Sequence, residues 1–243
     1  MAIQIVEILD RAIQGITRPF YCRCEDGQAY FVKGHGAGKR SLIAEYVGGH
    51  LARAFGLPVA EFEIVEVPAE LIKWCGRDDA KDLGTGLAFG SKALPYVQEF
   101  SVSHIPHVEV QMRKDVALFD WWVHNADRTL TEKGGNPNLL WDQANSKLAV
   151  IDHNQAFDTD FDAQLFAQSH VFHANLLDIF DDLVERETYR SRLSAAIAVF
   201  DFACDNVPDE WWRVDNGVPA SFNRDAIRAV LNRFMNNDFW RVA

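Results

Sequence analysis

Three polar residues of the types that phosphoryl transfer uses lie in one stretch of the sequence, residues 119–152. Asp127 follows an apolar run long enough for a buried helix, and Asn138 and Asp152 flank two short strand-like runs. Transfer of a phosphoryl group from ATP needs one Asp to receive the hydroxyl proton, and an Asn and a second Asp to hold magnesium on the phosphates. The three residues therefore predict a magnesium-dependent site, provided that the fold brings them together.

Two asparagines compete for the role of metal ligand. In the known pattern five positions separate the base from the Asn, whereas Asp127 and Asn138 are eleven positions apart. Asn136 precedes a proline, which favours extended backbone and a loop position. Asn138 directly precedes residues 139–141, which should pair with residues 148–151 in a hairpin that ends at Asp152. We therefore predict that Asn138 is the ligand, while a purely turn-shaping role for both asparagines is the alternative.

A lysine and a glutamate nearer the N-terminus could serve the same reaction. Lys33 ends a strand-like run, residues 29–33, and a lysine leaving such a strand can pair with phosphates. Glu45 lies beside the apolar stripe of a predicted helix, residues 41–55, from which it could reach Lys33. The alternative for both is an ordinary solvated position, which is where most lysine and glutamate side chains are found.

These residues must be positioned by an antiparallel meander that is followed by helices. Glu25-Asp26-Gly27 has the composition of a hairpin turn, and Gly56 is placed to end the first helix. Strands are expected at residues 2–9, 20–24, 29–33, 57–67 and 86–90, in addition to the 139–141 and 148–151 hairpin. Helices are expected at residues 41–55, 176–183, 186–201 and 224–234, over the later part of 108–125, and as an excursion within 68–83.

Composition narrows the classes of partner. The 243 residues are 48% hydrophobic and 12% aromatic, which is enough for a substantial core. The formal net charge of -11 argues against non-specific binding to nucleic acid or to an anionic membrane. No apolar run reaches the roughly 18 residues of a membrane helix. The four cysteines form no metal knuckle, so we expect reduced thiols and a cytoplasmic protein.

Several short motifs, taken in order, resemble the HipA-like kinase family and, more distantly, the phosphatidylinositol kinases. The resemblance runs from about residue 3 to residue 157 and is more specific as an ordered set than in any single motif. The motifs are Gly15-Ile16-Thr17-Arg18-Pro19, Phe31-Val32-Lys33, Glu45, Gly56-Leu57-Pro58-Val59, Phe89-Gly90-Ser91, Asn125-Ala126-Asp127-Arg128, Asn138-Leu139-Leu140 and Ile151-Asp152-His153.

The resemblance implies an α+β fold of the bilobal protein-kinase type. Residues 1–91 would form a nucleotide-binding N-lobe, an antiparallel sheet with one main helix, and residues 92–243 a mostly helical C-lobe. ATP and Mg²⁺ would be the cofactors. By the same resemblance, Asp127 would be the catalytic base, Lys33 would bind phosphates with Glu45 orienting it, Asn138 and Asp152 would hold the metal, and Gly15, Thr17, Arg18 and Phe89 would contact the nucleotide.

The sequence also departs from the family pattern. The usual His after Asp-Arg is Thr129, the loop from Asp127 to Asn138 is long, and His153-Asn154 replaces the end of the D-F-G element. The leading interpretation is a serine/threonine protein kinase. A small-molecule kinase of the aminoglycoside-phosphotransferase type and a nucleotide- or partner-binding pseudokinase are the alternatives. The acidic helical third is a candidate surface for a protein partner.

Overall fold

The computed structural model describes residues 2–13, 17–131, 134–214 and 217–242. The chain divides into two compact units. Unit 1 comprises residues 1–46, 60–95 and 207–221, and unit 2 comprises residues 47–59, 96–206 and 222–243. Helices and strands occur in both units, so the α+β content expected from the sequence is confirmed.

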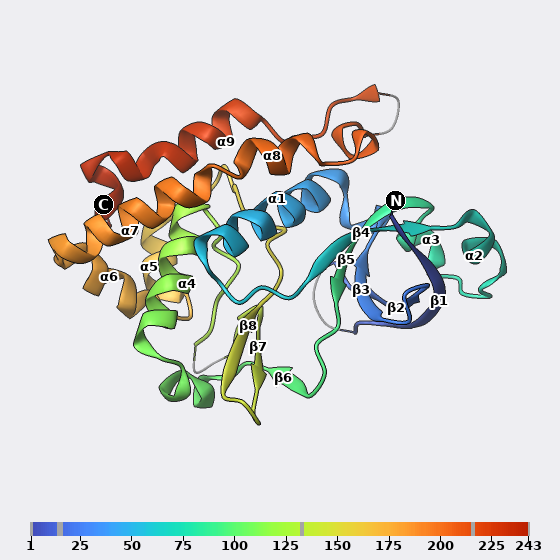
Figure 1. The fold of residues 1–243 in the computed structure, drawn as a ribbon, viewed down its shortest axis with the longest axis horizontal. Helices are drawn as coiled ribbons and strands as arrows, with labels where there is room; N and C mark the ends of the chain where they lie inside the picture. Colours follow the sequence, from blue (N-terminus) through green and yellow to red (C-terminus); the bar gives the residue numbers. More distant parts are fainter. Residues whose placement is uncertain (1, 14–16, 132–133, 215–216, 243) are drawn as a thin grey trace. The chain divides into compact units, whose positions relative to one another are not determined.

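Unit 1 is built on a closed barrel of five strands in the order β1-β2-β3-β5-β4 (Figure 1). The strands are β1 (Ile3–Arg11), β2 (Phe20–Cys24), β3 (Ala29–Lys33), β4 (Phe62–Val67) and β5 (Gly86–Lys92). Their alternating apolar side chains fill the interior, among them Ile5, Cys22 and Val65. Burial raises the pKa of the Cys22 and Cys24 thiols to about 12, so both cysteines act as small apolar residues.

The closed barrel with one parallel pair differs from the antiparallel sheet that the resemblance implies. β1 pairs with β2 in the antiparallel sense but runs parallel to β4, with Ile3 opposite Val65. Irregularities in the β1–β2 register, between Ile5 and Glu7 and between Ile8 and Asp10, allow the strand to bend toward this second partner. The parallel pairing closes the sheet, and closure removes the exposed strand edges of an open sheet.

A segment from the C-terminal part of the sequence completes unit 1. It contains the 3-10 turn η3 (Asp209–Trp212). The fully buried Trp211 donates from Nε1 to the carbonyl oxygen of Leu87 over 2.9 Å. Glu210 Oε1 accepts the backbone N–H of the same Leu87 over 3.0 Å. Strand β5 therefore depends on residues more than a hundred positions further along the chain.

Helix α1 (Lys39–Phe55) belongs to both units. Its first turns, up to Tyr46, are part of unit 1, and the turns from Val47 onward are part of unit 2. Gly56, with a φ of 98°, ends the helix as expected. Arg192 donates to the carbonyl oxygen of Phe55 over 3.0 Å and so satisfies one of the terminal carbonyl groups.

Unit 2 contains the predicted hairpin and the predicted helix that leads to Asp127. Helix α4 (Val110–Trp122) ends five residues before Asp127, and all of its residues from Asp115 onward are buried. β7 (Leu139–Asp142) and β8 (Lys147–Val150) pair with Leu139 opposite Val150. A short strand that the sequence did not predict, β6 (Val97–Glu99), adds a third member to this sheet.

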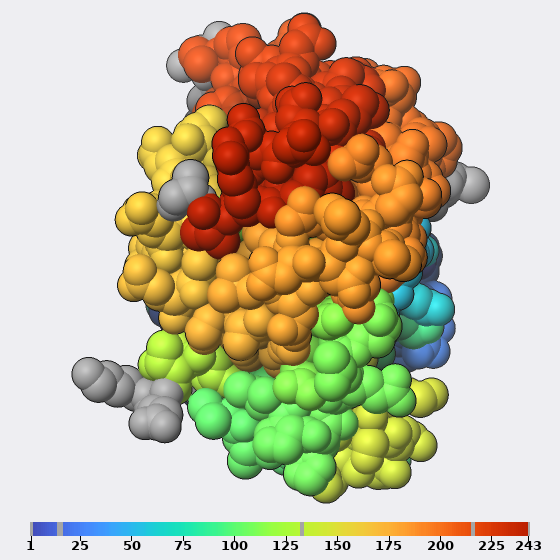
Figure 2. Space-filling view, turned by 90° about the vertical axis from the view of Figure 1, so that its left-hand side faces the viewer, coloured from blue at the N-terminus to red at the C-terminus, as the bar shows by residue number. Residues whose placement is uncertain are grey.

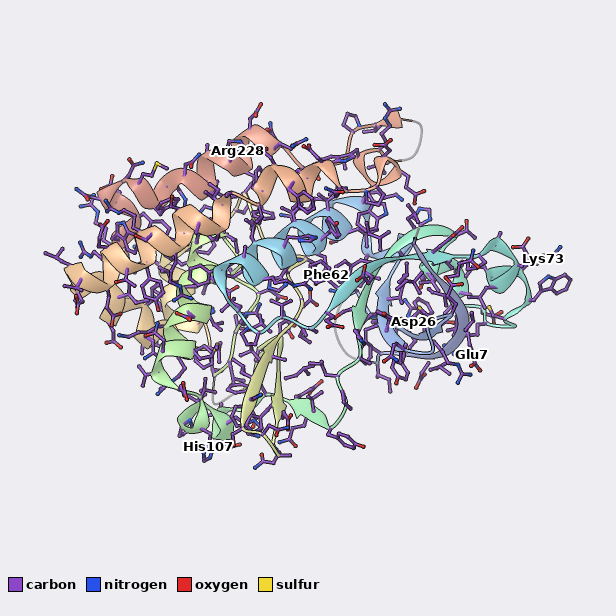
Figure 3. All side chains as sticks on the ribbon, viewed as in Figure 1. Glu7, Asp26, Phe62, Lys73, His107 and Arg228 are labelled. Atoms are coloured by element: carbon purple, nitrogen blue, oxygen red, sulfur yellow. The ribbon has the colours of Figure 1, made fainter. Side chains whose placement is uncertain are left out.

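The C-terminal helices contribute to the yellow, orange and red surface of Figure 2. They are α5 (Ala163–Ser169), α6 (His173–Asp181), α7 (Leu183–Ile197), α8 (Phe200–Asp205) and α9 (Arg224–Leu231), followed by η5 (Asn232–Met235) and η6 (Asn237–Trp240). Arg228 on α9, labelled in Figure 3, pairs with Asp201 on α8. None of the helices in the described ranges combines the length and the hydropathy of a membrane span.

Helix α5 was not expected from the sequence. Asp158, Asp160 and Asp162 look like the start of a calcium loop, although the glycine and glutamate of such a loop are missing. In the structure Asp162 is the N-cap of α5, and its Oδ1 accepts the backbone N–H groups of Gln164 and Leu165, each over 2.9 Å. The carboxylate thus serves a helix terminus.

Candidate active site

Lys33 and Glu45 form a buried ion pair in unit 1. Lys33 Nζ lies 2.8 Å from Glu45 Oε2, and the two side chains are 9% and 4% exposed. Lys33 is the last residue of β3, and Glu45 faces it from the second turn of α1. The solvated alternative for these side chains is therefore not what the structure shows. Because burial of a charge costs several kcal/mol, about as much as the pair returns, stability alone gives little reason for this arrangement.

The loop between β1 and β2 is held at its base by Arg11. The Arg11 guanidinium lies 2.8 Å from Asp82 and 3.5 Å from Asp79, and its Nε donates to the carbonyl oxygen of Arg18 over 3.2 Å. Arg18 is exposed and its φ is 38°, in the left-handed region that side chains rarely adopt. Thr17 is half-buried beside it. Gly15, the other expected nucleotide contact here, lies outside the described residues.

Phe89 lies directly opposite Lys33 in the barrel. The β3–β5 register pairs these two residues. Phe89 packs against Phe62 with the ring centroids 5.4 Å apart, and Phe62 in turn meets Tyr46 on α1 at 5.9 Å. Only 3% of the surface of Phe89 is exposed. Its ring is therefore mainly a packing surface behind Lys33.

Asp127 meets both candidate asparagines in unit 2. Its Oδ2 accepts the side-chain N–H of Asn138 over 2.9 Å and that of Asn136 over 3.0 Å. Asn136 is exposed, whereas Asn138 is partly buried. The contact with Asp127 therefore does not separate the two asparagines. The two asparagines differ in their distance from the hairpin along the chain, because Asn138 directly precedes β7 and Asn136 lies two residues earlier.

The long loop between Asp127 and Asn138 is closed at its neck by Thr129. Thr129 donates its backbone N–H to the carbonyl oxygen of Asn136 over 3.0 Å, and its Oγ1 accepts the N–H of Asn136 over 3.3 Å. A Cβ on Gly135 would lie 2.4 Å from the carbonyl oxygen of Thr129, so this close approach needs a glycine. Thr129 and Asn136 thus meet across the insertion, and the side chains of Asp127 and Asn138 stay in contact. Thr129, at the usual His position, therefore holds the two ends of the insertion together through its hydrogen bonds to Asn136.

Asn138 and Asp152 stand at the same end of the β7–β8 hairpin. The backbone N–H of Ile151 donates to the carbonyl oxygen of Asn138 over 3.1 Å, one step beyond the Leu139–Val150 pair. Asp152 is the next residue, as the sequence predicted. Asn138 and Asp152 have φ values of 48° and 60°, in the left-handed region. Asn and Asp adopt this region more readily than most other non-glycine residues, and such positions cluster at functional sites.

The donors at this end of the hairpin suit a hard cation. The amide nitrogen of Asn138 is directed at Asp127, so the oxygen of the same amide is the atom that a cation would bind. Asp152 adds a carboxylate, and Mg²⁺ prefers one or two such ligands together with phosphate oxygens. Among the residues that the structure describes, no group of three His, Cys, Asp or Glu side chains could hold a metal unaided. The donor set fits magnesium that is shared with a nucleotide.

His153, which follows Asp152 in the family-like motif, is buried and packs between helices. It is 2% exposed and meets Phe119 of α4 edge to face at 5.9 Å. A Cβ added to Gly48 on α1 would lie 2.9 Å from the Cβ of His153, so α1 approaches it very closely. The segment after Asp152 is therefore fixed between two helices, even though it lacks the usual residues.

Two buried charged residues next to the candidate site were not predicted from the sequence. Asp120 on α4 and Arg128 are both 0% exposed, and Arg128 Nε lies 2.7 Å from Asp120 Oδ2. Burial by itself raises the pKa of Asp120, but the charge of Arg128 and the hydrogen bond from His170 outweigh it, so the pKa lies below its ordinary value. The sequence did contain a clue to this pair. Asp120 is a lone carboxylate inside an apolar helical run, and a buried carboxylate needs a buried partner.

A comparison with solved structures found a kinase of similar fold. The proinflammatory kinase CtkA of Helicobacter pylori is similar over 99% of this chain and 97% of that chain, with a TM-score of 0.53 and 11% sequence identity. The FAT and kinase domain of CtTel1 matches 97% of this chain and 24% of that chain, with a TM-score of 0.28 and 12% identity. At 11% identity the likeness to CtkA is evidence of a common fold. A search of curated proteins found no match.

The sequence comparison extends further than the motifs alone. The family described as HipA-like kinase matches residues 5–243, which includes the helical C-terminal third where the motifs gave no signal. The match confirms the resemblance to this family that the ordered motifs indicated. The protein therefore belongs to the HipA-like kinase family and is a kinase.

Proposed function

We propose that the protein transfers the γ-phosphoryl group of magnesium-bound ATP to a serine or threonine hydroxyl of a protein. One observation carries the proposal. Asp127 and Asn138 are eleven positions apart, yet their side chains are joined over 2.9 Å, and Asn138 lies opposite the residue before Asp152. The proposed base and one proposed ligand are thus in contact, and the backbone just before the second proposed ligand adjoins them, which supports phosphoryl transfer.

Asp127 is the proposed catalytic base. As the substrate hydroxyl oxygen bonds to the γ-phosphorus, the Asp127 carboxylate receives the hydroxyl proton, and the bond from that phosphorus to the ADP oxygen breaks. The side-chain N–H groups of Asn136 and Asn138 orient the carboxylate. Asn138 and Asp152 would hold the magnesium, which supplies positive charge that offsets the phosphate charges.

Lys33 and Glu45 have the proposed task of binding and orienting phosphates. Glu45 fixes the lysine ammonium in a dry environment, where its charge acts strongly on an anion. Thr17 and Arg18, together with Gly15, are proposed to cover the phosphates, and Phe89 to support the nucleotide from behind Lys33. Residues 1–91 would act as the N-lobe and residues 92–243 as the C-lobe, with residues 207–221 packed into the first of the two units.

The test separates binding from transfer. Millimolar MgATP should raise the melting temperature of the wild-type protein, because a ligand at about 100 times its Kd stabilises the folded state by about 2.7 kcal/mol. Asp127→Asn should keep that shift but lower phosphate transfer by about 10²- to 10⁴-fold, since the amide cannot accept the proton. Asp160→Asn, at an exposed position further along unit 2, is the matched control and should change neither quantity.

Each outcome selects a function. Mass spectrometry after incubation with ATP should find phosphate on serine or threonine, first in the protein itself and then in a lysate. Transfer to small molecules alone would replace the protein substrate by an aminoglycoside-type substrate. A melting shift with no transfer to any acceptor would indicate a pseudokinase. No shift in a well-folded sample would refute nucleotide binding.

A further inference from the structure

Arg128 donates hydrogen bonds to the backbone at or beside both candidate metal ligands. Its Nη1 donates to the carbonyl oxygens of Pro137 over 3.2 Å and Ile151 over 3.1 Å, and also to that of Asn138. Asn138 is thus held through its own carbonyl group, and Asp152 through the residue before it. One guanidinium nitrogen therefore connects the start of β7 with the end of β8, where both ligands stand.

This connection fixes the backbone at the two ligands. Asn138 and Asp152 both have positive φ values, which Asn and Asp adopt more readily than most other non-glycine residues. Arg128 Nη1 makes charge-assisted hydrogen bonds to these carbonyl groups, and such bonds are about twice as strong as neutral ones. The spacing of the two ligands thus depends on where the guanidinium lies.

Asp120 fixes the guanidinium, and His170 and Asn125 fix Asp120. Asp120 Oδ2 lies 2.7 Å from Arg128 Nε and 3.0 Å from His170 Nε2, while Oδ1 accepts from Asn125 over 3.0 Å. His170 Nδ1 accepts the backbone N–H of Phe172 over 3.2 Å. The hydrogen of a neutral imidazole must then be on Nε2, so His170 donates to Asp120.

His170 is itself firmly placed at the end of α5. It is 1% exposed and stacks on Phe166 at 4.6 Å with an interplanar angle of 19°. Its neighbours pair with the chain just after Asp127, because Val171 N–H donates to the carbonyl oxygen of Arg128 over 3.0 Å. Thr129 and His170 form an antiparallel bridge. The C-terminal third thus reaches the catalytic loop at this point.

We propose that His170 is a positioning residue of the metal site, acting through Asp120 and Arg128 on the spacing of Asn138 and Asp152. The inference rests on the proposed function for the identity of the ligands. Residues one shell away from a metal ligand typically change metal affinity by about 10- to 100-fold when they are removed. Since His170 acts through two further side chains, we expect about the lower end of that range.

Three variants separate positioning from general stability. His170→Leu removes the donor to Asp120, whereas His170→Gln places an amide N–H where Nε2 was. His173→Leu, at an exposed position three residues on, is the matched control. The first readout is the magnesium concentration at half-maximal MgATP binding, with ATP binding in EDTA as reference. The second readout is amide hydrogen exchange at Ile151, whose N–H crosses the hairpin to Asn138.

The expected result is specific to the leucine variant. His170→Leu should raise the magnesium midpoint by about 10-fold, speed exchange at Ile151 and leave ATP binding in EDTA unchanged. In His170→Gln the magnesium midpoint and the exchange rate at Ile151 should both return close to the wild-type values. His173→Leu should resemble wild type in both readouts. A His170→Leu variant that folds and matches wild type in both readouts would overturn the inference, as would equal losses with leucine and glutamine.

Two further outcomes remain decisive. If wild type shows no magnesium-dependent binding of ATP, the proposed function fails, but the exchange comparison still decides whether His170 holds the hairpin end. If His170→Leu does not fold, Arg128→Lys takes its place. Lysine keeps a positive charge beside Asp120 but lacks the guanidinium nitrogen Nη1 that reaches the carbonyl oxygens of Pro137 and Ile151. That variant should show the same rise in magnesium midpoint and the same faster exchange, and unchanged values would refute the positioning role.

Discussion

The Lys33–Glu45 pair should be required for phosphate transfer and dispensable for stability. The two charged atoms are 2.8 Å apart and the side chains are almost fully buried. Removing one partner of such a pair costs about 3–5 kcal/mol, because the other charge stays buried without it. Replacing both by apolar side chains of similar volume is often neutral or stabilising by about 1–4 kcal/mol.

These changes in the free energy of unfolding predict changes in melting temperature. For a chain of this size, each kcal/mol shifts the melting temperature by about 2–4 °C, so Glu45→Ala should lower it by about 6–20 °C. The double variant Lys33→Met/Glu45→Leu should melt at or above the wild-type temperature. Both variants should lose phosphate transfer, because neither retains an oriented ammonium for the phosphates.

The assay combines thermal melting with phosphate transfer from ATP. The control is Lys92–Glu61, a pair on the same unit at 3.0 Å whose side chains are 32% and 75% exposed. Glu61→Ala should cost no more than about 1 kcal/mol, as expected for surface pairs, and leave transfer unchanged. A double variant that melts as low as Glu45→Ala would show that the pair is needed for stability. A double variant that still transfers phosphate at the wild-type rate would show that the pair is not needed for transfer.

Two further predictions concern unit 2. Asn138→Ala should raise the magnesium concentration needed for activity far more than Asn136→Ala does, because only Asn138 adjoins the hairpin end; equal effects in a magnesium titration would contradict this. Burial, assisted by the charge of Arg233 and only partly opposed by Asp158, lowers the pKa of His124 to about 4 from its ordinary 6.5. Between these values the unfolded chain binds more protons than the folded one, so stability should fall as the pH drops from about 7 toward 4. His124→Asn, which tolerates the φ of 54°, should flatten a plot of melting temperature against pH, and an unchanged slope would assign the effect to other groups.

Much of the architecture could be predicted from local pattern. Strands β2 and β3 have the predicted ends, because period-two alternation and the Glu25-Asp26-Gly27 turn leave little choice of register. Helix α1 begins two residues earlier than predicted and ends at Phe55 as predicted, where Gly56 takes a positive φ. The β7–β8 hairpin is also confirmed. These elements are determined by residues close together in the sequence.

What could not be predicted depends on partners far away in the sequence. The parallel β1–β4 pairing joins residues about sixty positions apart. Asp120 and His170 are fifty positions apart, and no local pattern connects them. The predicted positions of Asp127, Asn138 and Asp152 came from motif order, whereas the contact across the eleven-residue gap depends on the Thr129 neck. That neck is visible only in three dimensions.

The capping of β5 by Glu210 and Trp211 has a consequence for biosynthesis. A ribosome adds roughly 5–20 residues per second, so residues 207–221 follow the barrel strands by on the order of 5–20 s. During that interval the N–H and C=O groups of Leu87 lack the partners that they have in the finished protein. The capping of β5 can therefore be completed only after residues 96–206 have been synthesised. A barrel that forms as soon as its strands are made would keep this part of β5 open to water until Glu210 and Trp211 follow.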